Sequence, residues 1–114
     1  MRKKGEKMLI TREYKATVHE RVRREPEFAA ALLDEAVTLF LNGESDTARL
    51  ILRDLVNATV GFEALAHETA KPSKSLHRML SAKGNPTMDN LAAILKVLRQ
   101  KFQIHFEVRT VHCQ

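Results

Sequence analysis

Residues 65–80 read LAHETAKPSKSLHRML, and this stretch decides the fold. Two short apolar patterns at helical spacing flank residues 70–72, where Ala, Lys and Pro make the chain turn. A helix-turn-helix needs a small residue where its helices cross, and Ala66 is one. It needs a turn about four residues later, at Ala70, and an apolar anchor in the second helix, at Leu76. The spacing therefore predicts a helix-turn-helix.

The second helix of this motif has the composition of a DNA-reading helix. With Leu76, Met79 and Leu80 facing inward, the residues expected to face outward are Lys74, His77, Arg78 and Ser81. The N-terminal end of such a helix reaches base edges in the major groove, where Arg and Lys pair with guanine acceptors. No acidic residue, which would repel phosphate, lies between positions 71 and 84. The alternative interpretation is a pair of bundle helices with a solvated basic face.

Composition and charge agree with an acidic partner. The chain has 114 residues, which is typical of one domain, and its 44% hydrophobic content is that of a globular protein. The net charge is +5, but it is unevenly placed. Residues 28–70 carry two basic and seven acidic side chains, whereas residues 71–114 carry eight basic and two acidic ones. Positive charge thus returns at the predicted turn, as expected for nucleic-acid binding.

Other classes of function lack support in the sequence. The single cysteine, Cys113, cannot form an internal disulfide, and no apolar run reaches the ~20 residues of a membrane span. We therefore expect a cytoplasmic protein without a membrane partner. His105, His112 and Cys113 match no standard zinc spacing. No catalytic serine arrangement or Gly-rich phosphate loop is present, so we expect no enzyme, metal or cofactor.

Most of the remaining chain has helical periodicity, which predicts a mostly α fold of five to six helices. A thin stripe of Tyr14, Val18 and Val22 indicates a short helix over residues 13–24. Pro26 suits the first turn of the next helix, which ends at residues 42–43. The expected later elements are a helix capped by Ser45 or Asp46, helices over 62–69 and 73 to about 83, and a last helix capped by Thr87.

The C-terminus changes to strand periodicity. Phe102, Ile104, Phe106 and Val108 alternate with polar residues, which predicts a half-buried β-strand over residues 102–110. A lone strand needs a partner. The candidates are residues 8–11 of the same chain or the same strand of a second copy, and we favour the second, which makes the protein a homodimer.

The predicted organisation is a single domain with a short leader. Residues 1–12 form a flexible basic N-terminus, which is either a solubilising tail or an arm that touches DNA. Residues 13–114 form the domain. It comprises a helical part at 13–59, the helix-turn-helix part at 61–100 and the strand at 102–110.

Residues 61–95 resemble the helix-turn-helix of lambda-repressor-like (Xre-type) regulators. A longer match runs from about Leu9 to Val111. Its runs REPEFAAALLDEAV, ILRDLVNATVGFEALA, KSLHRML and GNPT resemble the HigA-type antitoxins, also called addiction-module antidote proteins. The resemblance implies a dimeric, lambda-repressor-like fold that binds double-stranded operator DNA. It also implies a RelE-like toxin as partner.

The resemblance assigns roles by position. Ser73, Lys74, His77 and Arg78 match the base-reading places, and Ser81, Lys83 and Asn85 match places that meet phosphate. Three residues depart from the family pattern. Ala70 stands where Gly is usual, Lys71 where an apolar residue is usual, and Phe62 where a polar, phosphate-contacting residue is usual. A positive φ at Ala70 would cost about 1 kcal/mol.

These observations predict a sequence-specific transcriptional repressor. In the antitoxin hypothesis, the protein is encoded in a type II toxin-antitoxin operon, represses its own promoter and neutralises the toxin. The alternatives are a stand-alone regulator without a toxin, and a toxin-inhibiting interaction module with little DNA binding.

Overall fold

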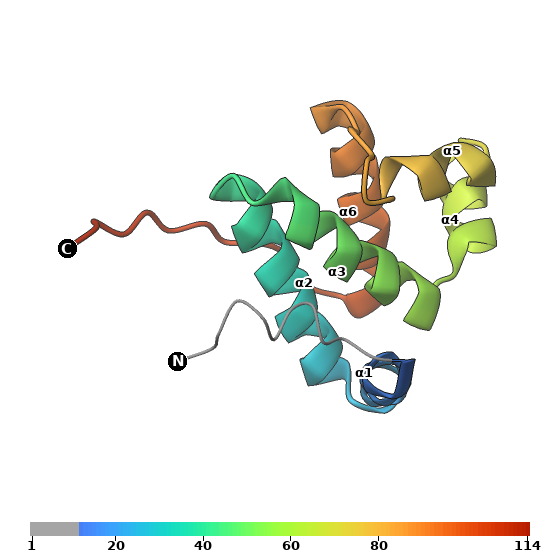
Figure 1. The fold of residues 1–114 in the computed structure, drawn as a ribbon, viewed down its shortest axis with the longest axis horizontal. Helices are drawn as coiled ribbons and strands as arrows, with labels where there is room; N and C mark the ends of the chain where they lie inside the picture. Colours follow the sequence, from blue (N-terminus) through green and yellow to red (C-terminus); the bar gives the residue numbers. More distant parts are fainter. Residues whose placement is uncertain (1–11) are drawn as a thin grey trace.

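The computed structural model describes residues 12–114, and these residues form a mostly helical fold. Six helices follow one another along the described chain (Figure 1). They are α1 (Arg12–Arg24), α2 (Pro26–Leu41), α3 (Ser45–Ala58), α4 (Phe62–Thr69), α5 (Ser73–Met79) and α6 (Met88–Phe102). This confirms the predicted mostly α fold. The predicted flexible N-terminus lies outside the described residues, except for Arg12, which begins α1.

The first three helices pack against one another around an aliphatic layer. α2 and α3 make the most extensive contact, and α1 lies against both. Val22, Leu33 and Leu52 are buried between them. Because apolar residues recur at helical spacing, each helix buries one stripe and leaves its charged face in water.

The turn from α1 to α2 is held by local contacts. Pro26 begins α2, as predicted, because a first-turn residue needs no backbone N–H donor. Arg21 donates from Nη2 to Glu25 Oε1 at 3.1 Å, and its guanidinium lies 3.9 Å from the centroid of the Phe28 ring. The hydrogen bond from Arg21 lowers the pKa of Glu25 below its ordinary value.

The same hydrophobic core continues into the second half of the chain. α4 packs against α5 and α6, and it also touches α3. The fully buried side chains of this half are Leu65, Leu76, Leu80, Ile94 and Leu98. They belong to one cluster with Leu33, Leu52 and Leu55 of the N-terminal helices. α4 and α5 are therefore anchored on the rest of the protein through a shared core.

Four described residues near helix ends have positive φ. Gly43 lies just after α2, Gly61 immediately precedes α4, and Ala70 and Gln103 directly follow α4 and α6. After α4, Lys71 N donates to Ala66 O at 3.1 Å and Ala70 N donates to His67 O at 3.4 Å. These two bonds form a Schellman motif, which satisfies carbonyls that the helix leaves unpaired.

Two predicted helix boundaries were wrong. α3 begins at Ser45 with Glu44 before it, and no side chain caps it. Neither Ser45 nor Asp46 is the cap, and the carboxylate of Asp46 instead accepts from Arg49. α5 ends at Met79 rather than near residue 83, because residues 81–84 turn sharply. Thr87 does cap α6, since its Oγ1 accepts from Asn90 N at 3.1 Å.

The prediction of a strand over residues 102–110 is also corrected. Phe102 ends α6, Gln103 is left-handed at φ 57°, and residues 104–114 have no regular secondary structure. The described part of the chain holds no second strand with which this segment could pair. The segment projects away from the helices at the end opposite α4 and α5 (Figure 1).

Within residues 12–114, none of the helices is long and apolar enough to cross a membrane.

The left-handed Ala70 yields a first prediction about stability. We expect Ala70→Gly to raise the free energy of unfolding by about 0.5–1 kcal/mol, because Gly removes the cost of positive φ but gains freedom in the unfolded chain. The control is Ala64→Gly at an exposed position inside α4. That variant should lose about 1 kcal/mol. Urea unfolding measures both, and equal losses at the two positions would contradict the strain at Ala70.

Candidate nucleic-acid interface

The turn between α4 and α5 is built by three consecutive residues. Ala70 is left-handed at φ 56° and ψ 39°, which reverses the chain immediately after α4. Pro72 is extended at φ −61° and ψ 138°, and its carbonyl accepts from Leu76 N at 3.2 Å. Proline restricts φ and cannot continue α4, so α5 starts at Ser73 in a new direction. The residues of this turn thus form a tight connection of three residues between α4 and α5.

α5 has one buried and one exposed face, as its spacing predicted. Leu76 in α5 and Leu80 just after it are completely buried, and Met79 is half-buried. Lys74, His77 and Arg78 are exposed on the other side. The seven residues of α5 rise about 10 Å, which is comparable to the ~12 Å width of a DNA major groove.

The other predicted site residues lie at the start of α5 and in the loop after it. Ser73 is half-buried at the start of α5, and Lys83 and Asn85 are exposed in the loop after it. Among the described residues, no hydrogen bond or ion pair occupies the side chains of Lys74, Arg78 or Lys83. Three cations without a local counter-ion therefore lie on α5 and the loop that follows it.

Ser81, which was predicted to face outward and contact phosphate, has intramolecular partners instead. It is half-buried, and its hydroxyl donates to Arg78 O at 2.8 Å. Its backbone carbonyl accepts from Arg49 Nε at 3.0 Å. Ser81 is thus engaged in ending α5.

His77 also has an intramolecular partner. Its ring stacks on Phe62, with centroids 3.9 Å apart and an interplanar angle of 20°. Phe62 is the first residue of α4 and is buried, whereas His77 is exposed. The imidazole therefore covers an apolar ring with one face, and this contact ties the start of α4 to the middle of α5.

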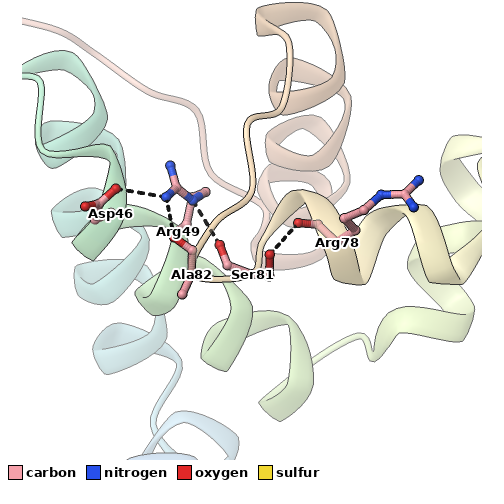
Figure 2. Close-up of polar contacts among 5 residues, drawn as sticks. All are labelled: Asp46, Arg49, Arg78, Ser81 and Ala82. Carbon is pink, nitrogen blue, oxygen red and sulfur yellow. Dashed lines mark hydrogen bonds and ion pairs between the residues drawn. The ribbon is translucent and has the colours of Figure 1, made fainter.

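The loop after α5 is held by a buried arginine from α3. Arg49 donates from Nε to Ser81 O at 3.0 Å and from Nη2 to Ala82 O at 2.8 Å. Nη2 also contacts Asp46 Oδ1 at 2.9 Å. Figure 2 shows the guanidinium reaching the loop, while Arg78 points away on the other side of α5. The arrangement positions the end of α5 against α3 and leaves Arg78 free.

At residue 84 the chain comes back close to the end of α5 and completes this loop. Gly84 is buried, and its N–H donates to Ser81 O at 3.0 Å. A Cβ atom built on Gly84 would overlap the backbone carbonyls of Arg78 and Met79. Only glycine fits without a shift of the backbone, so this position defines where α5 stops.

Sequence reasoning missed the role of Arg49. The signal was nevertheless present, because Arg49 lies three and seven residues before Leu52 and Val56, which are both buried. It therefore continues the apolar stripe of α3. A charged residue on such a stripe is seldom buried without partners, so it predicts a specific set of acceptors.

Within the α4–α5 pair, the lysine and arginine side chains lie on α5 and not on α4. Glu63 and Glu68 are exposed on α4, so the first helix of the motif is acidic. A polyanion would thus meet α5 before α4 on electrostatic grounds. Among the described residues, no three His, Cys, Asp or Glu side chains gather closely enough to hold a metal ion.

The comparisons with known proteins returned no match to a family model, to a curated protein or to a solved structure.

The Arg49 contacts give a second prediction. Arg49→Met should lower the free energy of unfolding by about 1–3 kcal/mol, because the carbonyls of Ser81 and Ala82 lose buried donors. Arg49→Lys should recover only part of this loss, since an ammonium lacks the planar fork of donors. Arg53→Met on the same helix is the control and should change stability by less than ~0.5 kcal/mol.

Asp46→Asn separates the carbonyl contacts from the ion pair in the same urea experiment. The Asp46 side chain is 91% exposed, whereas that of Arg49 is 8% exposed. Water screens a carboxylate so exposed, so its loss should have little effect. A loss in Asp46→Asn as large as that in Arg49→Met would show that the ion pair accounts for the stabilisation.

Proposed function

We propose that this protein is a sequence-specific DNA-binding repressor that reads the major groove with α5. The observation that carries the proposal is the exposed face of α5, where Lys74 and Arg78 lie without local counter-ions above a buried Leu76 and Leu80. A cationic helix anchored by its apolar face is the arrangement that other helix-turn-helix proteins insert into the groove.

The proposed mechanism divides the contacts into two kinds. Arg78 and Lys74 pair with base acceptors, and Ser73 at the start of α5 donates to a base or phosphate. Lys83 and Asn85 contact phosphate from the loop that Arg49 holds. His77 takes a smaller part than its position suggests, because one face of its ring is used against Phe62.

The proposal includes a homodimer on a near-palindromic operator. Two copies of α5 would lie in successive major grooves, about 34 Å apart or a multiple of that distance. The C-terminal segment would become a strand when a second copy supplies its partner. In this proposal the protein is the antitoxin of a type II toxin-antitoxin operon. It represses its own promoter and neutralises a RelE-like toxin.

A second candidate function is toxin inhibition with little DNA binding. The acidic balance of residues 28–70 supports it, because exposed carboxylates such as Asp34, Glu35 and Glu44 would attract a basic protein. A stand-alone repressor differs from both only in lacking a toxin. A short basic reading frame beside the gene favours the antitoxin, and its absence favours the stand-alone regulator.

A gel shift separates DNA binding from the interaction module. The probes are the duplex just upstream of the coding sequence and a random duplex of equal length. We expect tighter binding to the upstream duplex, with affinity falling steeply as salt rises. Equal and weak binding to both would favour the interaction module.

Arg78 should discriminate between DNA sequences. We expect Arg78→Ala to cost about 1–3 kcal/mol on the selected operator and to relax one operator position. Lys96→Ala on α6 removes an exposed positive charge away from α5 and serves as the control. Selection of bound sequences from a random pool measures the effect. An unchanged preference in Arg78→Ala would remove Arg78 from the reading residues.

Lys83 should contribute affinity without selectivity. We expect Lys83→Ala to weaken binding to operator and random duplex by similar factors. It should also reduce the salt slope, the change in log K with log[salt], by about 1. Titrations at several salt concentrations measure this slope. A slope equal to that of the unaltered protein would contradict a phosphate contact.

A further inference from the structure

Ile104 and Phe106 of the C-terminal segment pack against the core, but its later apolar residues have little to pack on. Val108 is 70% exposed and Val111 is 76% exposed, although both are large hydrophobic residues. The last backbone N–H of the segment with a partner among the described residues is that of Ile104, which donates to Arg99 O at 3.1 Å. Beyond it, residues 105–114 offer unpaired backbone groups together with exposed apolar side chains.

An open hollow beside this segment is lined by both polar and apolar side chains. It measures about 860 Å³ and lies between residues 106–111 and the C-terminal half of α2. Val37 and Leu41 line it, and Leu41 is 58% exposed. Apolar side chains of a second extended segment would be removed from water there.

We propose that two copies pair through residues 104–112 as antiparallel strands, with Val108 opposite Val108 of the second copy. This rests on the homodimer of the proposed function and specifies how its copies dock. The two-fold axis would pass beside Val108. Opposite residues of an antiparallel pair share a face, so Ile104, Phe106 and Val108 of both strands would lie on the side of α2, and Val111 on the other side.

Charge complementarity selects this register. Within residues 104–112 the only acid is Glu107 and the only Lys or Arg is Arg109. With Val108 at the axis, Glu107 of each copy faces Arg109 of the other, so two opposite-charge pairs form. Such directly opposite pairs stabilise a sheet, and like charges in the same place destabilise it.

The neighbouring registers are less favourable. An axis at Glu107 or Arg109 places two like charges directly opposite each other. A two-fold axis that passes between two consecutive residues would place apolar residues opposite polar ones. Neither side of the two-stranded ribbon would then be apolar. An axis at Phe106 places Arg109 opposite Gln103, whose left-handed φ of 57° is not that of a strand.

This pairing leaves the proposed DNA-reading face uncovered. The C-terminal segment projects at the end of the molecule opposite α4 and α5 (Figure 1). Dimer formation and DNA binding can therefore be altered separately. A test of the dimer without DNA does not depend on whether α5 binds DNA.

A charge exchange tests the register. Sedimentation over a range of protein concentrations, without DNA, measures the dimer dissociation constant. We expect Glu107→Arg and Arg109→Glu each to raise this constant about tenfold, since each creates two like-charge pairs. The double variant, with both charges exchanged, should return to within about threefold of the unaltered protein.

Two outcomes would overturn the proposal. One is a double variant that dimerises no better than the single variants, because the charges would then not face each other. The other is an unaltered protein that stays monomeric, as expected if residues 8–11 of the same chain are the partner. Circular dichroism should show equal helix content throughout, since residues 107 and 109 lie outside all described helices.

Disulfide trapping places the axis directly. In a Cys113→Ser background, Val108→Cys should form a disulfide-linked dimer on mild oxidation, because opposite Cα atoms lie about 4.5–5.5 Å apart. Glu107→Cys is the matched control. Its two thiols would lie diagonally on either side of the axis, too far apart for easy bonding, and should react at least tenfold more slowly. Equal rates at 107 and 108 would refute the register. A gel shift on the trapped dimer reports DNA binding separately. Its failure would count against the proposed function alone.

Discussion

The guanidinium of Arg49 joins the two halves of the protein. It extends from α3 and donates to the carbonyls of Ser81 and Ala82, directly after α5. Both hydrogen bonds are partly buried, and an acceptor left unpaired in a buried position costs about 1–3 kcal/mol. The planar fork of an arginine reaches both from two nitrogens at once, whereas a lysine has a single nitrogen to offer. The position of α5 relative to α3 therefore depends on a polar contact within an otherwise aliphatic core.

The start and end of α5 are set by different kinds of constraint. Its start follows from local chemistry, because left-handed Ala70 and extended Pro72 leave little freedom before Ser73. Its end follows from tertiary contacts, because Gly84 returns so closely that a Cβ would overlap the carbonyls of Arg78 and Met79. Local signals were visible in the sequence. The close approach of Gly84 to the end of α5 was not visible, because it depends on where Arg49 holds the loop.

The same distinction explains which parts of the fold were predictable. Helical spacing gave the helices of the first half, and Pro26 and Thr87 marked helix starts correctly because each acts within one turn. Asp46 failed as a cap because its carboxylate contacts Arg49 instead. The strand over residues 102–110 failed for a different reason. Its alternating pattern is real, but a strand needs a partner that the described part of the chain does not contain.

The candidate site was predictable in outline and less so in detail. Leu76 and Leu80 are buried, while Lys74 and Arg78 are exposed, as the period of a helix requires. Side-chain contacts across helices do not follow from that period. Phe62 looked like a missing phosphate contact and His77 like a reader, yet the two rings stack at 3.9 Å. The Phe at the start of α4 thus has its ring covered by an exposed residue of α5. Selectivity in the proposed complex would then depend on Arg78 and Lys74, whose charged groups have no such partner among the described residues.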